Sequence, residues 1–264
     1  MILLEEVGST NTYVKEHFGE IPDGTLVSAR CQTAGRGRLG RKWLAKKDCD
    51  ITASIALKKL EDGFHAGVIS GLAVLRLVRE CVPGALSFLK WPNDVYIREK
   101  KVCGILSEGI VSGGRLQGVV CGMGVNVNST ESDLSGAGQP ATSLAIEAGR
   151  EFNVKILTEK LEKYLQECYI NFNLDFSAVL HEWKRENRLT GEVIEAVSPA
   201  GTRFTGVFRE IDASGAMVLE CEDGIRIFSC GDVKIDVART DWEKMRRSIY
   251  GGGAVCECAL NGNV

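Results

Sequence analysis

The feature that most constrains the fold is a change of pattern near Leu189. Downstream of this residue the chain contains only short runs rich in β-branched and aromatic residues, separated by Gly and Asp turns. Closely spaced strands without a helical segment are typical of a small β-barrel. We therefore expect one domain at residues 1–189, a small barrel at 190–238 and a poorly ordered tail at 239–264. The strands expected in the barrel are 191–197, 202–211, 215–221, 224–229 and 232–237.

Helical and strand patterns are mixed in the first 189 residues. The polar Ser9-Thr10-Asn11 run is typical of a helix start, because short polar side chains satisfy free backbone N–H groups. No regular β–α–β alternation follows, which favours an α+β domain with a mixed, largely antiparallel sheet and flanking helices over a doubly wound one. The expected helices are 12–18, 64–81, 155–174 and 177–187, and the expected strands are 25–32, 51–59, 86–91, 95–97, 101–111 and 116–128.

The charge balance argues against bulk binding of nucleic acid. The chain has 32 Lys and Arg, 35 Asp and Glu and a formal net charge of -3, whereas such binders are usually basic or carry a basic domain. The N-terminus lacks a secretion signal, and the longest candidate membrane segment, 72–78, is short and contains an arginine. The ten cysteines form no C-x-x-C pair. We expect a cytoplasmic protein with buried free thiols, no membrane partner and no zinc site.

A short basic loop, 34-AGRGRLGRKW-43, follows the strand expected at 25–32. Its three arginines, Arg36, Arg38 and Arg41, provide planar, permanently charged donors that suit carboxylate and phosphate. The glycines between them permit close approach of the backbone to a ligand. The motif favours an anionic ligand, and taken alone it leaves two alternatives, a solvated flexible loop or an RGG-like nucleic-acid segment.

Two further motifs place charged side chains beside apolar strands. In 90-KWPNDVYI-97 a turn at 92–94 would hold Lys90 and Asp94 in fixed positions, and a plain ion pair is the alternative. In 101-KVCGILSE-108, Lys101 begins an almost wholly apolar strand, where an ammonium is costly unless it meets an anion. Gly104 would let a ligand lie against the backbone. A strand-end lysine facing water is the alternative for Lys101.

A glycine pair precedes two asparagines in 122-GMGVNVN-128. Strand alternation would place Asn126 and Asn128 on one face. Their amides could read the edge of a nucleotide base or lie near a metal, and capping of a strand end is the alternative. The segment lacks the third glycine and the following helix pattern of a dinucleotide-binding turn.

Taken in order, these motifs resemble those of the biotin protein ligases (biotin–[acetyl-CoA-carboxylase] ligases). The resemblance covers residues 8–128 in motifs and extends to residue 237 in layout. It implies a biotin/lipoate ligase-like catalytic domain followed by an SH3-like β-barrel. It also implies an enzyme that uses ATP, with Mg²⁺ as Mg-ATP, to convert biotin to biotinyl-5′-AMP, and then transfers biotin to a lysine of a biotin carboxyl carrier domain.

The resemblance also implies roles for particular residues. Lys101 would bridge the biotin carboxylate and the α-phosphate, Arg36 would share in catalysis, and Asp94 would assist the incoming lysine amine. The Arg/Gly loop (residues 34–43) would close over biotin and the adenylate, and no protein residue is expected to ligate a metal. The implied biotin contacts are Ser9, Thr10, Asn11, Gln32, Gly35, Arg36, Arg38, Lys101, Gly104 and Leu106. The implied ATP contacts are Arg38, Arg41, Trp43, Lys90 and Asn126.

Several alternatives stay open. The chain begins eight residues before Ser9, so we expect a form without the N-terminal DNA-binding domain of repressor members and with no nucleic-acid partner. Family members include monomers and edge-to-edge dimers, so a homodimer is one of two alternatives. A relative that transfers lipoyl or octanoyl groups, a nucleic-acid-binding regulator and a non-catalytic biotin-binding protein are the competing functions.

Overall fold

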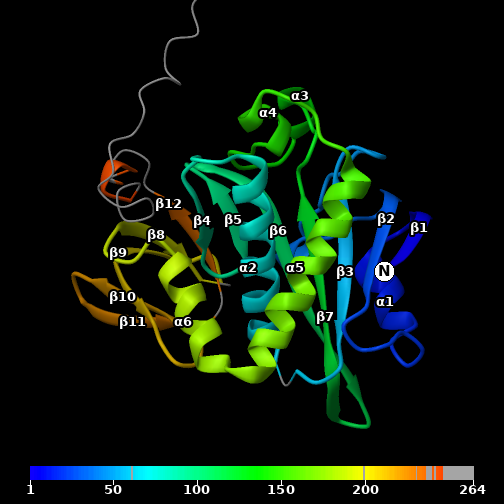
Figure 1. Ribbon diagram of the computed structural model, residues 1–264. Coiled ribbons are helices and arrows are strands. Elements are labelled where there is room, and N and C mark those ends of the chain that lie inside the picture. Colours follow the sequence, from blue (N-terminus) through cyan, green and yellow to red (C-terminus); the bar gives the residue numbers. More distant parts are fainter. Residues whose placement is uncertain (61, 199, 230, 236–239, 241, 246–264) are drawn as a thin grey trace, which may run out of the picture.

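The computed structural model describes residues 1–60, 62–198, 200–229, 231–235, 240 and 242–245 (Figure 1). Two sheets organise the described chain: a seven-stranded sheet of order β1-β2-β3-β7-β6-β5-β4 and a five-stranded sheet of order β11-β10-β9-β8-β12. The strands of the first sheet are β1 (Ile2–Val7), β2 (Leu26–Gln32), β3 (Ile51–Leu57), β4 (Ser87–Lys90), β5 (Asp94–Ile97), β6 (Lys100–Ser112) and β7 (Arg115–Val125).

The first sheet is mixed and largely antiparallel, which confirms the α+β prediction. Only β1 and β2 pair in parallel, and the remaining neighbours in this sheet are antiparallel. Strand β1 was not predicted from the sequence. It lies at the sheet edge and is only partly buried, and its sequence has three apolar residues followed by the acidic pair Glu5-Glu6 instead of a clear strand pattern. The helices are α1 (Thr10–Glu16), α2 (Gly63–Cys81), α3 (Glu131–Leu134), α4 (Leu144–Ala148), α5 (Val154–Leu174) and α6 (Phe176–Glu186).

The main core lies between the seven-stranded sheet and α2, which packs against β6, β7 and α5 (Figure 1). Helix α2 is buried along most of its length, and its N-cap Asp62 accepts a hydrogen bond of 2.8 Å from the backbone N–H of His65. Because side chains alternate along a strand, Leu26 and Ile55 face this core while Val27 and Ala56 face α1 on the opposite side. The opposite side therefore carries little apolar bulk and is available for a site.

The C-terminal strands form a small antiparallel β domain, as expected. They are β8 (Val193–Val197), β9 (Arg203–Ile211), β10 (Met217–Cys221), β11 (Gly224–Phe228) and β12 (Asp232–Ile235). Phe208, Met217 and Leu219 of these strands are fully buried and belong to the main hydrophobic core. The expected continuation of the last strand to residue 237, and all of the expected tail except residues 240 and 242–245, lie outside the described residues.

A buried hydrogen bond connects the two sheets. Trp91, which precedes β5 and is 1% exposed, donates through Nε1 to the carbonyl oxygen of Gly215 at 2.9 Å. Gly215 has a positive φ of 83°, and a Cβ at this position would lie 2.5 Å from the Phe64 ring at the start of α2. Glycine is thus required there both by backbone conformation and by close packing.

Two of the boundaries that differ from prediction concern expected site residues. Asp94 begins strand β5 and is not part of the preceding turn. Strand β7 ends at Val125, so the prediction that Asn126 and Asn128 share one face of a strand is wrong. The chain leaves the sheet there because buried Asp50 accepts hydrogen bonds from the Val127 backbone N–H at 2.8 Å and from the Ser129 hydroxyl at 2.5 Å. The loop expected at 129–140 contains the short helix α3.

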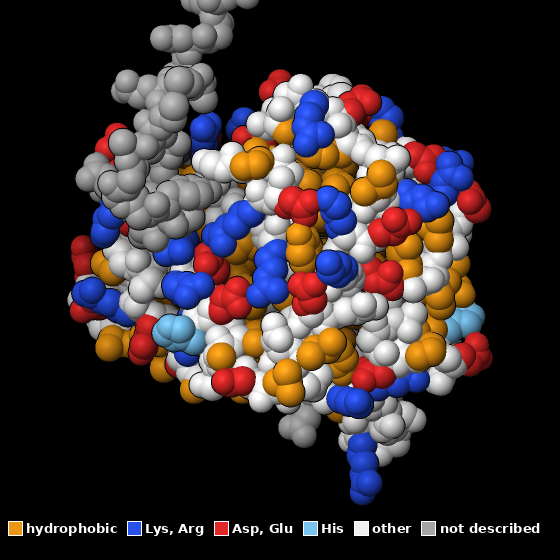
Figure 2. Space-filling model, viewed as in Figure 1, with side chains coloured by type: hydrophobic (Ala, Val, Ile, Leu, Met, Phe, Trp, Pro, Cys, Tyr) orange, Lys and Arg blue, Asp and Glu red, His pale blue; other side chains and the backbone are white. Residues whose placement is uncertain are grey.

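Charged side chains are interspersed on the face shown in Figure 2, where lysines and arginines alternate with acidic groups over the helices. Ion pairs such as Arg76–Glu182 and Lys160–Glu80 connect neighbouring helices there. This face therefore presents no extended region of single-sign charge. The expected burial of cysteines is found at Cys81, Cys103, Cys121 and Cys168.

Candidate active site

A pocket lies on the face of the seven-stranded sheet opposite α2, with a floor of glycines. Strands β6 and β7 pair so that Gly104 lies opposite Gly124 and Leu106 lies opposite Gly122. A Cβ at Gly104 would lie 2.8 Å from the Trp43 ring, one at Gly124 would overlap that ring, and one at Gly122 would overlap the Asn11 amide. The floor therefore lets side chains and ligands lie directly on the strand backbone.

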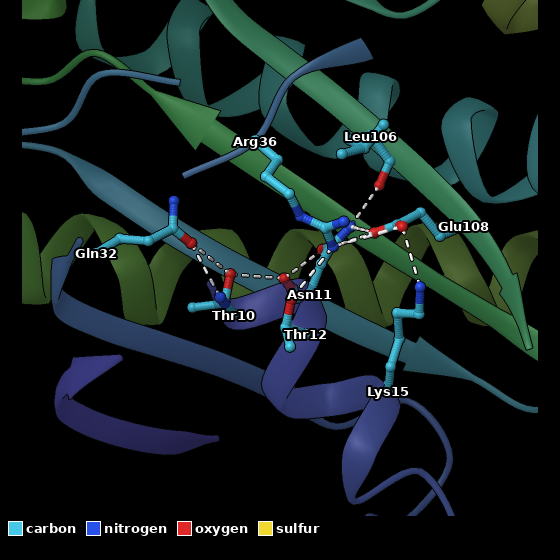
Figure 3. A network of polar contacts seen from close by, with 9 residues as sticks. Thr10, Asn11, Thr12, Lys15, Gln32, Arg36, Leu106 and Glu108 are labelled. Carbon is cyan, nitrogen blue, oxygen red and sulfur yellow. Dashed lines mark hydrogen bonds and ion pairs between the residues drawn. The ribbon is translucent and has the colours of Figure 1, made fainter. Parts of the chain in front are cut away.

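The polar end of the pocket is built at the start of α1. Ser9 is the N-cap residue of α1 and is buried, as are Thr10 and Asn11. Gln32, at the end of β2, accepts hydrogen bonds from the Thr10 backbone N–H at 2.9 Å and from its hydroxyl at 3.2 Å. The buried Ser54 hydroxyl lies 2.7 Å from Thr10 Oγ1 and 2.6 Å from Asn11 Oδ1. These contacts hold hydrogen-bond donors and acceptors in fixed positions at this end of the pocket; Figure 3 shows Thr10, Asn11 and Gln32.

A lysine–aspartate pair lies at the centre of the pocket. Lys101 Nζ is 2.7 Å from Asp94 Oδ1, and the two side chains are only 13% and 11% exposed. Within the described part of the chain, no donor approaches that oxygen with hydrogen-bond geometry. The ammonium also lies 5.6 Å from the centroid of the Trp43 ring. The Lys101 ammonium and the Asp94 carboxylate therefore lie together above the glycine floor, both largely shielded from water.

The Arg/Gly loop crosses over this pair. It folds back on itself through a bridge between Arg36 and Lys42 and a one-turn 3₁₀ helix at Arg38–Gly40. Arg38 donates to Asn93 Oδ1 at 2.9 Å, and Arg41 forms an ion pair with Asp232 of β12. Asp232 also lies 3.9 Å from Arg38. The C-terminal sheet thus contributes a carboxylate that holds the loop beside the pocket.

Gly35 and Trp43 join the two ends of the loop. The Trp43 backbone N–H donates to the Gly35 carbonyl at 3.0 Å, and a Cβ on Gly35 would lie 2.7 Å from Gln32 Nε2. The indole ring of Trp43 lies flat on the glycine floor, and its Nε1 is buried with no hydrogen-bond partner in the described structure. A partly exposed aromatic ring in a pocket is suited to stacking against a planar ligand, and its N–H stays available as a donor.

Lys90 lies beside the pocket in an adjoining cavity that is also lined by Arg41, Asp94 and Asp232. It is 6% exposed, and its Nζ lies 4.8 Å from the centroid of the Tyr96 ring. Burial lowers the pKa of Lys90 to about 8, because desolvation disfavours the charged form. In the described structure its Nζ has no hydrogen bond or ion pair, although Asp94 is its cross-strand neighbour. The plain Lys90–Asp94 ion pair considered from the sequence is therefore not formed, since Asp94 pairs with Lys101 instead.

The structure brings together most of the residues expected at the site. The predicted residues that line the pocket are Ser9, Thr10, Asn11, Gln32, Arg36, Arg38, Arg41, Trp43, Asp94, Lys101, Gly104 and Leu106. Gly35 lies at the base of the loop, and Lys90 lies in the adjoining cavity. Asn126 lines a second, smaller cavity with Trp43 and Lys101, while its side chain donates to the Thr142 carbonyl at 2.9 Å.

Several residues of the site were not predicted, among them Ser54, Glu108, Asn93 and Asp232. Ser54 and Glu108 carry a usable signal, because each is a polar residue in a strongly apolar strand. Asn93 lies within the KWPND motif, although no role was assigned to it. Asp232 has no such signal, because it lies 191 positions from Arg41 in the sequence and reaches the loop only through packing of the second sheet.

The chain is similar to known ligases over nearly its whole described length. Residues 3–126 match the biotin/lipoate A/B protein ligase family. The biotin–[acetyl-CoA-carboxylase] ligase of Mycobacterium tuberculosis is 30% identical over 241 residues, which cover 88% of this chain and 87% of that protein. The bifunctional ligase/repressor BirA of Bacillus subtilis is 30% identical over 219 residues, 81% of this chain and 67% of BirA.

A solved structure supports the same relationship. Biotin protein ligase from Aquifex aeolicus, in complex with biotin and ATP, aligns with a TM-score of 0.73 and 30% identity over 88% of this chain and 97% of that one. The fold is thus that of a ligase of the biotin/lipoate family. The chain belongs to the biotin protein ligases, and its activity is biotin–protein ligation. None of its described helices contains an apolar stretch long enough to cross a membrane.

Proposed function

We propose that this pocket carries out both half-reactions of biotin ligation and that its protein substrate is the biotin carboxyl carrier domain of a biotin-dependent carboxylase, acetyl-CoA carboxylase in particular. The observation that supports this most directly is the Lys101–Asp94 pair on a glycine floor beneath the Arg/Gly loop. The Lys101 ammonium can contact both the biotin carboxylate and the α-phosphate of ATP, and the Asp94 carboxylate can accept a hydrogen bond from the amine of the carrier lysine. The names of the M. tuberculosis and Paracoccus denitrificans relatives support the choice of carrier.

In the proposed first step, a biotin carboxylate oxygen attacks the α-phosphorus of ATP and the bond to pyrophosphate breaks. The two reactants repel one another, so the site needs positive charge between them. Lys101 would supply it, because its ammonium is held at a fixed place by Asp94 and is only 13% exposed. Arg36 and Arg38 would add charge from the loop. The biotin ureido ring would lie at the polar end, where Ser9, Thr10, Asn11 and Gln32 offer fixed donors and acceptors, and its bicyclic body would lie on Gly104 and Leu106.

ATP would lie toward the other end, with its base against Trp43 and Asn126 and its phosphates near Arg38, Arg41 and Lys90. Mg²⁺ is commonly bound through one or two carboxylates together with substrate phosphates. Asp94 and Asp232 line this part of the site but pair with Lys101 and Arg41, so Mg²⁺ would arrive as Mg-ATP, held by the triphosphate. The ion would neutralise phosphate charge, and the described residues include no cluster of three acidic, His or Cys ligands that would hold it alone.

In the proposed second step, the carrier lysine amine attacks the acyl carbon of biotinyl-5′-AMP. An amide bond forms, the acyl–phosphate bond breaks, the amine loses a proton and AMP leaves. Asp94 Oδ1 pairs with Lys101, and its remaining lone pair can accept a hydrogen bond from that amine. Closure of the Arg/Gly loop would exclude water from the anhydride between the two steps.

The two sheets are proposed to belong to two domains with different roles. Residues 1–189 would form the catalytic domain and residues 190–238 a supporting β domain that contacts the loop through Asp232. The use of ATP fits a cytoplasmic enzyme. Sedimentation at several concentrations would distinguish a monomer from a homodimer.

The decisive experiment is ATP-dependent transfer of biotin to a purified biotin carboxyl carrier domain, followed by pyrophosphate release and mass spectrometry. We expect one added biotin on one lysine. Adenylate formed with lipoate but not with biotin would contradict the proposal, as would biotin binding without pyrophosphate release. Steep salt-dependent binding of DNA in place of ligation would favour the nucleic-acid alternative.

A further inference from the structure

Glu108 accepts hydrogen bonds from three side chains at the edge of the pocket. Its carboxylate accepts from Asn11 Nδ2 at 2.8 Å, Lys15 Nζ at 3.1 Å and Arg36 Nη2 at 3.1 Å (Figure 3). Asn11 and Lys15 belong to α1, whereas Arg36 belongs to the Arg/Gly loop. Glu108 itself lies on β6, seven positions after Lys101. One carboxylate on a rigid strand therefore joins the polar end of the pocket to the loop.

The carboxylate also sets the orientation of the Asn11 amide. Asn11 donates to the Leu106 carbonyl at 3.1 Å and to Glu108, while its Oδ1 lies 2.6 Å from the Ser54 hydroxyl. The amide lies tightly over Gly122, where a Cβ would overlap it. Two acceptors therefore surround the amide nitrogen and a hydroxyl meets its oxygen, so a flipped amide would turn its oxygen toward an anion.

Glu108 is ionised in this setting. Its side chain is 21% exposed, and although burial alone would raise its pKa, hydrogen bonds from Asn11 and Lys15 and the charge of Arg36 lower the pKa. The loop end of the network is more exposed, because the Arg36 side chain is 45% exposed. Arg36 also donates to the Thr12 hydroxyl at 3.2 Å. The first arginine of the loop is thus tied to α1 and β6 at a point outside the Lys101–Asp94 centre.

We propose that Glu108 is a positioning residue for biotin. It fixes the Asn11 amide in one orientation and anchors the loop through Arg36 before biotin enters the pocket. This role rests on the proposed placement of biotin at the polar end. Glu108 does not reach the reacting atoms, so its loss should weaken biotin binding and loosen the loop while leaving the chemistry of a saturated enzyme nearly intact.

The test compares Glu108→Gln with Lys15→Met. Glu108→Gln keeps the size of the side chain but removes the charge, and it offers an amide N–H₂ where donors converge. Lys15→Met removes another cation from the same carboxylate without touching Asn11 or the loop. We expect Glu108→Gln to raise KM for biotin about tenfold, as for loss of a charge-assisted hydrogen bond. The kcat for adenylate formation should change less than about threefold, and Lys15→Met should match wild type.

A second measurement reads the loop directly. Trypsin can cut after Arg36, Arg38, Arg41 and Lys42, so the rate at which fragments with these ends appear in the ligand-free protein, followed by mass spectrometry, reports loop opening. We expect Glu108→Gln to be cut several times faster than wild type and saturating biotin to remove most of the difference. A simple surface ion pair would give neither effect, because such pairs contribute little.

The outcomes separate the positioning role from the biotin placement. Unchanged KM for biotin and unchanged cleavage in Glu108→Gln would refute the positioning role, as would equal effects of Lys15→Met. A fall in kcat at saturating biotin with constant KM would also refute it. Thr10→Ala tests the placement separately: if it leaves KM for biotin unchanged, the proposed biotin subsite is wrong, whereas a raised KM in Thr10→Ala alone would refute only the role of Glu108.

Discussion

Lys101 Nζ and Asp94 Oδ1 lie 2.7 Å apart across strands β5 and β6, in a pocket floored by glycine. The pairing holds a cation where two anionic substrates would meet and leaves the paired oxygen without a hydrogen-bond donor in the described structure. The two residues are therefore expected to serve different half-reactions, and variants of each should be separable by assay.

Replacing Lys101 with alanine should abolish formation of biotinyl-5′-AMP. The loss removes the central positive charge and leaves Asp94 unpaired, and we expect a fall of at least about 10³-fold in pyrophosphate release. Lys100→Ala is the matched control. Lys100 is the neighbouring lysine on β6, it lies opposite Ile97 in the strand register, and its side chain does not line the pocket. Near wild-type release by Lys101→Ala would refute the assigned role.

Asp94→Asn should act mainly on transfer. With biotinyl-5′-AMP supplied directly, we expect labelling of the carrier lysine to slow about 10²- to 10³-fold, as for loss of a group that assists proton removal. The measurement is single-turnover transfer to a carrier domain followed by mass spectrometry. If transfer from the supplied adenylate is unaffected while adenylate formation fails, Asp94 serves the first step only.

Arg38→Gly should make the enzyme release its activated intermediate. Arg38 holds the loop through Asn93 and lies 3.9 Å from Asp232, so its removal takes away the hydrogen bond to Asn93 and leaves Arg41 as the loop's contact with Asp232. We expect biotinyl-5′-AMP to leave the enzyme about tenfold faster, as for loss of one charge-assisted hydrogen bond, and to label lysines of bystander proteins. Arg30→Ala is the control, since that exposed arginine pairs with Glu5 and Asp48 away from the pocket. Unchanged retention of the intermediate would contradict the loop's proposed role.

The affinity of the free enzyme for ATP should fall as pH rises through about 8. The pKa of Lys90 is lowered to about 8 by burial, so its charge is present below that pH and lost above it. If Lys90 meets the phosphates, kcat/KM for ATP decreases on the alkaline side, because this ratio reports groups of the free enzyme. Lys90→Arg stays charged and should flatten the decline. An identical alkaline limb in both proteins would exclude Lys90 as its cause.

Trp91→Phe should destabilise the protein by about 1–3 kcal/mol, because the buried Gly215 carbonyl loses its donor. Equilibrium urea unfolding measures the change in the free energy of unfolding. Trp43→Phe is the control: its Nε1 has no partner in the described structure, so the same substitution there should leave stability nearly unchanged while affecting ATP binding. Equal destabilisation by both variants would show that the Trp91 hydrogen bond has no special weight.

Local patterns in the sequence were sufficient for most elements and for the motifs. Helices α2, α5 and α6 have a strong helical period and ended within a few residues of the expected positions. The strand-only pattern after Leu189 likewise specified the second sheet. Strand β1 could not be predicted, because an edge strand buries few side chains and its sequence therefore shows little alternation of apolar and polar residues. The end of strand β7 before Asn126 could not be predicted either, because it depends on a hydrogen bond from Val127 to Asp50, which lies 77 positions away in the sequence.

The sequence by itself determined the chemistry that the chain can offer: an Arg/Gly loop, a lysine at the start of an apolar strand, an aspartate in KWPND and a polar helix start. These are properties of residue type and short-range order. Tertiary structure alone decided that Lys101 pairs with Asp94 and not Lys90 with Asp94, that Asp232 reaches the loop and that Glu108 meets Arg36. The physical reason is strand register and sheet packing, which join residues up to 191 positions apart and leave no local periodicity to reveal them.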